Sequence, residues 1–129
     1  MLRILALGTL GVGLLATTPV SAVTLVGASQ FDENHAFTKT MRKFEEEVKA
    51  CYDGGVRLFE FTNRGDRAHL LFQELITWAE ASFPDIVLGV GSVVEAPTAA
   101  SYIQLGANFV VSPVLNEEMA RVCNRRKIP

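Results

Sequence analysis

From residue 23 onward, the spacing of apolar residues alternates between two positions, as in a strand, and about 3.6 positions, as in a helix. Short apolar runs at residues 23–26, 56–62, 86–90 and 109–111 are separated by longer amphipathic segments. Strands and helices that alternate in this way are typical of a parallel α/β sheet. The pattern predicts four strand–helix units, and residues 128–129 stand where a fifth strand would start.

The first predicted helix has the most regular pattern. Its apolar residues follow one another at spacings of four and three positions: Phe37, Met41, Phe44, Val48 and Cys51. Opposite charges stand four residues apart on its other side, as in Arg42 and Glu46. Gly54 and Gly55 are predicted to end this helix.

Local signals also mark the ends of the other helices. Asp66 is predicted to cap the second helix, which Pro84 ends. Pro97 fits the first turn of the third helix, and Asn116 is predicted to cap the fourth. The fourth helix has acidic residues at its start and basic residues at its end: Glu117, Glu118, Arg125, Arg126 and Lys127. Charges placed in this order complement the helix dipole.

The amino terminus has the layout of a secretory signal peptide. Arg3 precedes an apolar run at residues 4–16, and small residues follow at positions 20–22. Three glycines dilute this run, which is short for a membrane span. Residues 1–22 are therefore interpreted as a signal peptide or as a mispredicted start, with a buried segment as a further alternative. Residues 23–129 are predicted to form one domain.

Composition excludes several classes of protein. The 129 residues carry a formal net charge of −2, which offers no basic surface for nucleic acid or an anionic membrane. Cys51 and Cys123 lack metal-ligand spacing and are predicted to be buried free thiols, and no metal or other cofactor is predicted. His35 and His69 are interpreted as structural or exposed residues. The chain is also too short to close an eight-stranded barrel, which takes roughly 200 residues or more.

The strand at residues 56–62 carries the first candidate site residue. Alternation places Glu60 on the face opposite Phe59 and Phe61, near the carboxyl end of the strand. A carboxylate in a half-apolar position has a raised pKa, which suits a general base, and Arg64 is the predicted nearby cation. The alternative is a solvent-facing Glu60 on an edge strand, with Arg64 as a surface charge.

Two glycines follow the next strand, within the sequence Gly-Val-Gly-Ser at residues 89–92. Glycines there permit backbone to approach a small anionic ligand, but local grounds favour the alternative, a tight βα turn. The dinucleotide-binding fingerprint is incomplete, so nicotinamide binding is not predicted. The local sequence around Pro113, just after the fourth strand, predicts only that this residue lies in a loop.

Residues 54–65, with the sequence GGVRLFEFTNRG, resemble the 2-keto-3-deoxy-6-phosphogluconate/4-hydroxy-2-oxoglutarate aldolase family. The similarity continues through GVGS at residues 89–92, QLGANF at 104–109, Ser112 and Pro113, and CNRRK at 123–127. The resemblance implies a (β/α)8 TIM barrel, here an incomplete barrel of about four βα units. It also implies a cytoplasmic homotrimer that cleaves a keto acid to pyruvate and an aldehyde through a lysine Schiff base, without metal.

The resemblance assigns roles to four residues. Glu60 matches the general acid/base, and Arg64 matches the ligand of the pyruvate carboxylate. Ser92 stands where the family often has threonine, and Pro113 matches a proline that lines the pocket. The Schiff-base lysine of the family lies on a later strand, outside this sequence, and the segment before residue 45 fits the family poorly. These departures suggest a fragment, a mispredicted gene, or a designed or recombined half-barrel.

Three functions remain open from the sequence. The first is an aldolase that acts on a small keto-acid substrate, represented here by its amino-terminal half. The second is a non-catalytic half-barrel that binds small carboxylates or associates with a copy of itself, because open strand edges favour association. The third is an exported binding module, which would follow if residues 1–22 act as a signal peptide.

Overall fold

The computed structural model describes residues 3–5, 22–26 and 35–129. One four-stranded sheet has the order β1 (Arg3–Leu5), β2 (Ala22–Val26), β3 (Leu58–Thr62) and β4 (Val87–Gly91). β2, β3 and β4 run parallel, which confirms the predicted α/β sheet. β1 pairs antiparallel with β2 and was not predicted. The rest of the predicted signal peptide lies outside the described residues.

The predicted strand at residues 109–111 is reduced to a single bridge between Val90 and Val110. The Val111 amide donates to the Val90 carbonyl oxygen (2.8 Å), so the segment runs beside β4 for only a short distance. The chain then turns, because the Ser112 hydroxyl bonds both the carbonyl oxygen and the amide of Val114. The prediction of a full strand was therefore wrong in length.

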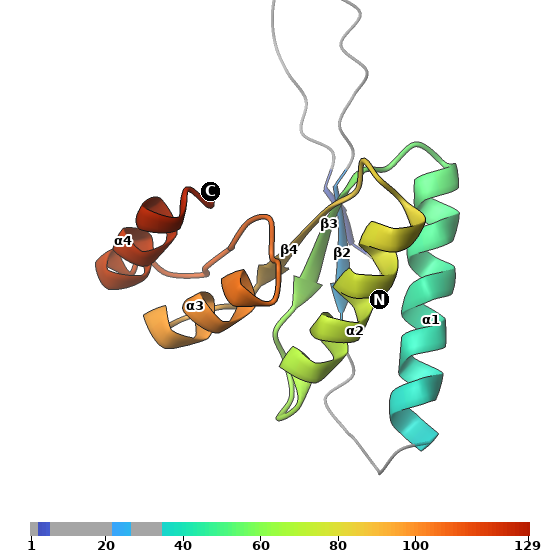
Figure 1. Ribbon diagram of the computed structural model, residues 1–129, viewed down its shortest axis with the longest axis horizontal. Helices are drawn as coiled ribbons and strands as arrows, with labels where there is room; N and C mark the ends of the chain where they lie inside the picture. Colours follow the sequence, from blue (N-terminus) through green and yellow to red (C-terminus); the bar gives the residue numbers. More distant parts are fainter. Residues whose placement is uncertain (1–2, 6–21, 27–34) are drawn as a thin grey trace, which may run out of the picture.

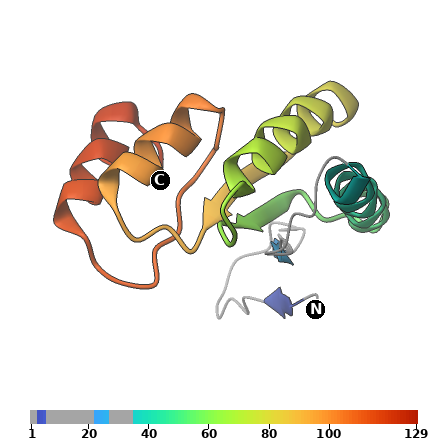
Figure 2. The same cartoon turned by 90° about the horizontal axis from the view of Figure 1, so that it is seen from below.

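Helices α1 (His35–Asp53) and α2 (Ala68–Ser82) cover one face of the sheet, as Figures 1 and 2 show. α3 (Ala96–Gln104) and α4 (Glu117–Arg126) lie beyond β4, at the opposite side of the molecule from α1. Each parallel strand is thus followed by a helix, as the sequence pattern predicted. No helix in the described part of the chain is long and apolar enough to cross a membrane.

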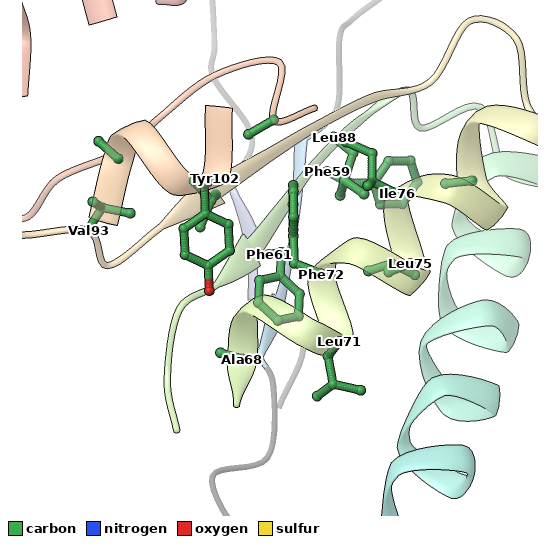
Figure 3. Packing of buried hydrophobic residues seen from close by; sticks show 14 of the residues in the cluster. Phe59, Phe61, Ala68, Leu71, Phe72, Leu75, Ile76, Leu88, Val93 and Tyr102 are labelled. Atoms are coloured by element: carbon green, nitrogen blue, oxygen red, sulfur yellow. The ribbon is translucent and has the colours of Figure 1, made fainter. Parts of the chain in front are cut away.

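The hydrophobic core lies between the sheet and these helices. Phe59 and Phe61 of β3 are fully buried beneath them. The Phe61 ring makes edge contacts with Phe44 of α1 at 5.9 Å and with Phe72 of α2 at 5.5 Å between ring centroids. Phe72 in turn contacts Tyr102 of α3 at 5.1 Å (Figure 3). This continuous row of rings fixes the side of β3 that faces the helices.

Two of the three predicted helix starts are confirmed. Pro97 stands in the first turn of α3, and the Asn116 side chain accepts a hydrogen bond from the Met119 amide (2.9 Å) at the start of α4. The prediction for Asp66 was wrong, because α2 begins at Ala68 after Arg67, which makes no side-chain capping bond. The chain turns instead through backbone bonds, with the Ala68 amide donating to the Gly65 carbonyl oxygen.

The two cysteines are free, and burial raises the pKa of both thiols. Cys123 is buried as predicted, whereas Cys51 is only half-buried near the end of α1. Within the described ranges, no three His, Cys, Asp or Glu side chains gather in a way that would hold a metal ion.

Candidate active site

Glu60 lies on the face of the sheet opposite α1 and α2, which we call the Glu60 face. Leu58, Glu60 and Thr62 of β3 share this face with Gly89 and Gly91 of β4, because paired residues of parallel strands point the same way. Glu60 is half-buried, whereas its neighbours in sequence are buried under the helices. The predicted orientation of the strand is therefore confirmed.

The Glu60 carboxyl group reaches across β4 toward its carboxyl end. The register pairs Glu60 with Gly89, but the side chain occupies the space above Gly91. A Cβ atom added at Gly91 would overlap Oε1 of Glu60. Only a residue without a side chain leaves room for the carboxyl group at this position.

Burial raises the pKa of the Glu60 carboxyl above its ordinary value of 4.5. Removing water from a carboxylate disfavours its charged form, and no hydrogen bond or ion pair from the described residues offsets this cost. A carboxyl group with a raised pKa exchanges protons closer to neutral pH. The position suits a general acid/base.

Arg64 does not pair with Glu60. Its side chain is exposed, and no ion pair joins the two residues in the described part of the structure. The Arg64 amide donates to the Thr62 carbonyl oxygen (2.9 Å), so the chain turns away directly after β3. The role of Arg64 as a nearby cation that binds a carboxylate stays a prediction.

Ser92 lies directly after β4, whereas Pro113 lies in the loop before α4. Ser92 directly follows Gly91 and adopts a left-handed backbone conformation, with φ of +61°. The Asn63 amide donates to the Gly91 carbonyl oxygen (2.9 Å), which holds the ends of β3 and β4 together at this edge. Pro113 is exposed in the loop before α4, and its role as a pocket residue stays a prediction.

The sequence places Gly89 within the predicted strand at residues 86–90 and Gly91 in the turn after it, and the second placement was wrong. β4 extends to Gly91, so Gly89 and Gly91 are strand residues on the Glu60 face. Each has a side chain above it, because the Phe109 ring covers Gly89 as the Glu60 carboxyl covers Gly91. Their function is to make room for these two neighbours.

Sequence reasoning missed three residues that support this edge of the sheet. The Tyr102 hydroxyl donates to Oδ1 of Asn63 (2.8 Å), and burial raises the pKa of Tyr102 to about 12. Asn108 accepts a hydrogen bond from the Leu88 amide (2.8 Å), which ties residues 107–111 to β4. These contacts join residues that are 20 to 39 positions apart in the sequence, so no local sequence pattern predicts them.

All four lysines lie within the described residues, and none is on the Glu60 face. Lys39, Lys43 and Lys49 are exposed on α1, which packs on the opposite face of the sheet. Lys43 and Lys49 pair with Glu47 and Asp53 on the same helix. Lys127 is exposed after the end of α4. Within the described residues, the Glu60 face therefore holds a half-buried carboxyl group and no lysine amine.

The fold and this edge of the sheet match known proteins. A family model for KDPG and KHG aldolase matches residues 36–129. The chain belongs to this family. The KHG/KDPG aldolase of Escherichia coli K12 is 30% identical over 92 residues, which cover 69% of this chain and 41% of that enzyme.

Solved structures of this family share the fold. The KDPG aldolase of Legionella pneumophila, with pyruvate captured as a covalent carbinolamine, superimposes with a TM-score of 0.62 at 21% identity. The match covers 82% of this chain and 44% of that chain. The fold is thus that of the TIM-barrel class, and the chain is a partial barrel that spans less than half the length of these relatives.

A second kind of relative matches over a shorter stretch. A solute-binding protein of Sulfitobacter sp. (strain NAS-14.1) is 58% identical over 43 residues, which cover 33% of this chain and 13% of that protein.

Proposed function

We propose that this chain supplies the general acid/base of an aldehyde-lyase that cleaves 2-keto-3-deoxy-6-phosphogluconate or 4-hydroxy-2-oxoglutarate. The products are pyruvate and an aldehyde. Glu60 moves the protons, Arg64 and Ser92 bind the carboxylate of the substrate, and Pro113 lines the pocket. The observation that carries the proposal is the half-buried Glu60 carboxyl, which lies above Gly91 at the carboxyl edge of a parallel sheet and pairs with no cation among residues 35–129.

The proposed reaction needs an amine that these 129 residues do not place near Glu60. A lysine amine attacks the keto group and loses water, which forms an iminium ion. Glu60 then removes the proton of the hydroxyl group beside the scissile bond, the carbon–carbon bond breaks, and its electron pair enters the iminium. Glu60 returns the proton to the resulting enamine carbon, and water releases pyruvate. We propose that the lysine comes from outside the present sequence.

A fusion tests this assignment. The 129-residue chain is joined to the part of the E. coli KHG/KDPG aldolase that lies beyond the matched region. Borohydride with pyruvate should leave an adduct on the fusion and none on the 129-residue chain, as read by intact mass. Glu60→Gln should lower the kcat of the fusion by about 10²–10⁴-fold, the usual contribution of general acid/base catalysis.

Asp85→Asn is the matched control, because it removes a carboxylate at the other end of the same strands. It should leave kcat unchanged. A fusion that traps pyruvate and cleaves the substrate equally well with Glu60→Gln would contradict the proposed role. An adduct on any lysine of the 129-residue chain would contradict the proposed source of the amine.

The proposed assembly is a cytoplasmic homo-oligomer, a trimer in the complete family fold. Exposed apolar side chains support self-association of the 129-residue chain: Val87, Val94, Val111, Val114 and Leu115. Sedimentation should show oligomers that Leu115→Lys weakens, since Leu115 is 90% exposed. A stable monomer at all concentrations would contradict this.

A non-catalytic module that binds small carboxylates is the second candidate. The position of all four lysines away from the Glu60 face favours it. The similarity to a solute-binding protein over 43 residues supports a binding role for this candidate. Binding of pyruvate to the 129-residue chain by calorimetry, together with an inactive fusion, would favour this function over the lyase.

A further inference from the structure

A single row of residues crosses the sheet at the level of Glu60. β3 and β4 pair Glu60 with Gly89. The Val90 amide donates to the Phe109 carbonyl oxygen (3.0 Å), and Val90 bridges in parallel to Val110. Phe109 is therefore the neighbour of Gly89 on the far side of β4. Glu60, Gly89 and Phe109 share one face, because laterally paired residues of parallel strands point the same way.

The middle position of this row has no side chain, and its neighbours fill the space differently. The Phe109 ring lies over Gly89, where three of its atoms would overlap an added Cβ. The Glu60 side chain cannot use the same space, and its carboxyl group lies over Gly91 instead. Gly89 and Gly91 are two residues apart on one strand, about 7 Å, so the ring and the carboxyl group stand side by side.

We propose that Phe109 is a positioning residue, whose ring directs the Glu60 carboxyl toward the carboxyl edge of the sheet and keeps water from its inner side. This inference rests on the proposed function, in which Glu60 must meet substrate beside Ser92. Without the ring, the carboxyl group could turn back over Gly89 into the sheet. The packing of one aromatic side chain thus sets where the acid/base acts.

Within residues 35–129, no charged residue lies beside Glu60 on this face. In the strands before them, the register places Thr24 of β2 beside Glu60 and the cation Arg3 of β1 beyond Thr24. On the Glu60 face, β4 contributes Val87, Gly89 and Gly91, and the neighbouring segment contributes Phe109 and Val111, none of which ionises. Arg64, the cation nearest in sequence beyond β3, is exposed. Burial is accordingly the cause of the raised pKa of the Glu60 carboxyl.

The test compares Phe109→Leu and Phe109→Ala with Phe83→Leu in the 129-residue chain. Phe83 is a half-buried ring at the opposite end of the sheet and serves as the matched control. The 13C signal of the Glu60 carboxyl is followed through a pH titration. Its midpoint should move toward 4.5, more for alanine than for leucine, and should not move in Phe83→Leu. An unchanged midpoint in folded Phe109→Leu would overturn the proposal.

Gly91→Ala provides a second route if Phe109→Ala does not fold. It leaves the ring in place and displaces the carboxyl group, so the Glu60 midpoint should also change. In the fusion, Phe109→Leu should lower kcat by about 10- to 100-fold with little change in KM, as expected for a misplaced acid/base. If Glu60→Gln leaves the fusion active, the proposed function fails, whereas the midpoint shift by itself decides the role of Phe109.

Discussion

The amino end of β3 and β4 carries Arg57 and the carboxylate of Asp85, and the carboxyl end carries Arg64 and the carboxylate of Glu60. The surroundings of the two carboxylates differ. At the amino end, Asp85 accepts a hydrogen bond from Nε of Arg57 (2.8 Å) and another from the Tyr52 hydroxyl. The Arg57 guanidinium stands 3.7 Å above the centre of the Tyr52 ring. These two hydrogen bonds hold the pKa of Asp85 below its ordinary value, and the bond to Asp85 raises the pKa of Tyr52.

At the carboxyl end, Glu60 and Arg64 stand four residues apart without meeting. Glu60 is half-buried with a raised pKa, and Arg64 is exposed. Similar residues therefore form a hydrogen-bonded ion pair at the amino end, whereas no ion pair joins Glu60 and Arg64 within the described residues. Barrels of this class place reactive groups at the carboxyl ends of strands and reserve the amino ends for stability, which this contrast matches.

The strongest way to disturb the carboxyl end is to fill its two glycine positions. Gly89→Ala should lower the free energy of unfolding by about 1–3 kcal/mol, because a whole Phe109 ring must move in a packed layer. Gly91→Ala should cost less, since it displaces the free end of a flexible Glu60 side chain. Urea denaturation measures both values, and a larger loss for Gly91→Ala would contradict the assigned packing.

Removal of each arginine compares the two ends directly. Arg57→Ala should lower the free energy of unfolding by about 1–2 kcal/mol, because Nη1 of Arg57 also bonds the carbonyl oxygens of Tyr52 and Val56. Arg64→Ala should change it by less than about 0.5 kcal/mol, as is usual for an exposed residue. If both variants lost the same free energy of unfolding in this denaturation series, the two ends of the strands would not differ in the way described.

The pH dependence of stability should have opposite signs for the two carboxylates. Because the pKa of Asp85 is lowered in the folded state, its ionised carboxylate stabilises the fold above about pH 3.8. This stabilisation is lost as the pH falls through the folded-state pKa of Asp85. The raised pKa of Glu60 means that its charge costs stability above the folded pKa, and the cost disappears as pH falls toward 4.5.

Asp85→Asn and Glu60→Gln isolate these two contributions. At neutral pH, Asp85→Asn should be less stable than the wild type and Glu60→Gln more stable. Thermal denaturation from pH 3 to pH 8 should show both differences shrinking in acid. A Glu60→Gln variant that is less stable at neutral pH would indicate a partner for Glu60.

The sequence predicted the parts of the fold that depend on local spacing. The period of two on β3 separated Glu60 from Phe59 and Phe61, and the side chain of Asn116 capped α4 as expected. The start of α2 was missed because backbone bonds at Gly65 replace a side-chain cap.

The remaining features depend on contacts between distant segments. The row from Glu60 to Phe109 exists only after β3, β4 and the bridged segment at residues 109–111 align in register, and no local pattern fixes that alignment. Likewise, the separation of Arg64 from Glu60 depends on the turn at Thr62 rather than on the spacing of the two residues.

The most direct test of the account is a 13C titration of both carboxyl groups in the unmodified 129-residue chain, with assignments from Glu60→Gln and Asp85→Asn. The account predicts that Glu60 titrates above 4.5 and Asp85 below 3.8 in the same sample. A Glu60 midpoint at or below its ordinary value would show a solvated or paired carboxylate and would contradict its assignment as the acid/base of the site.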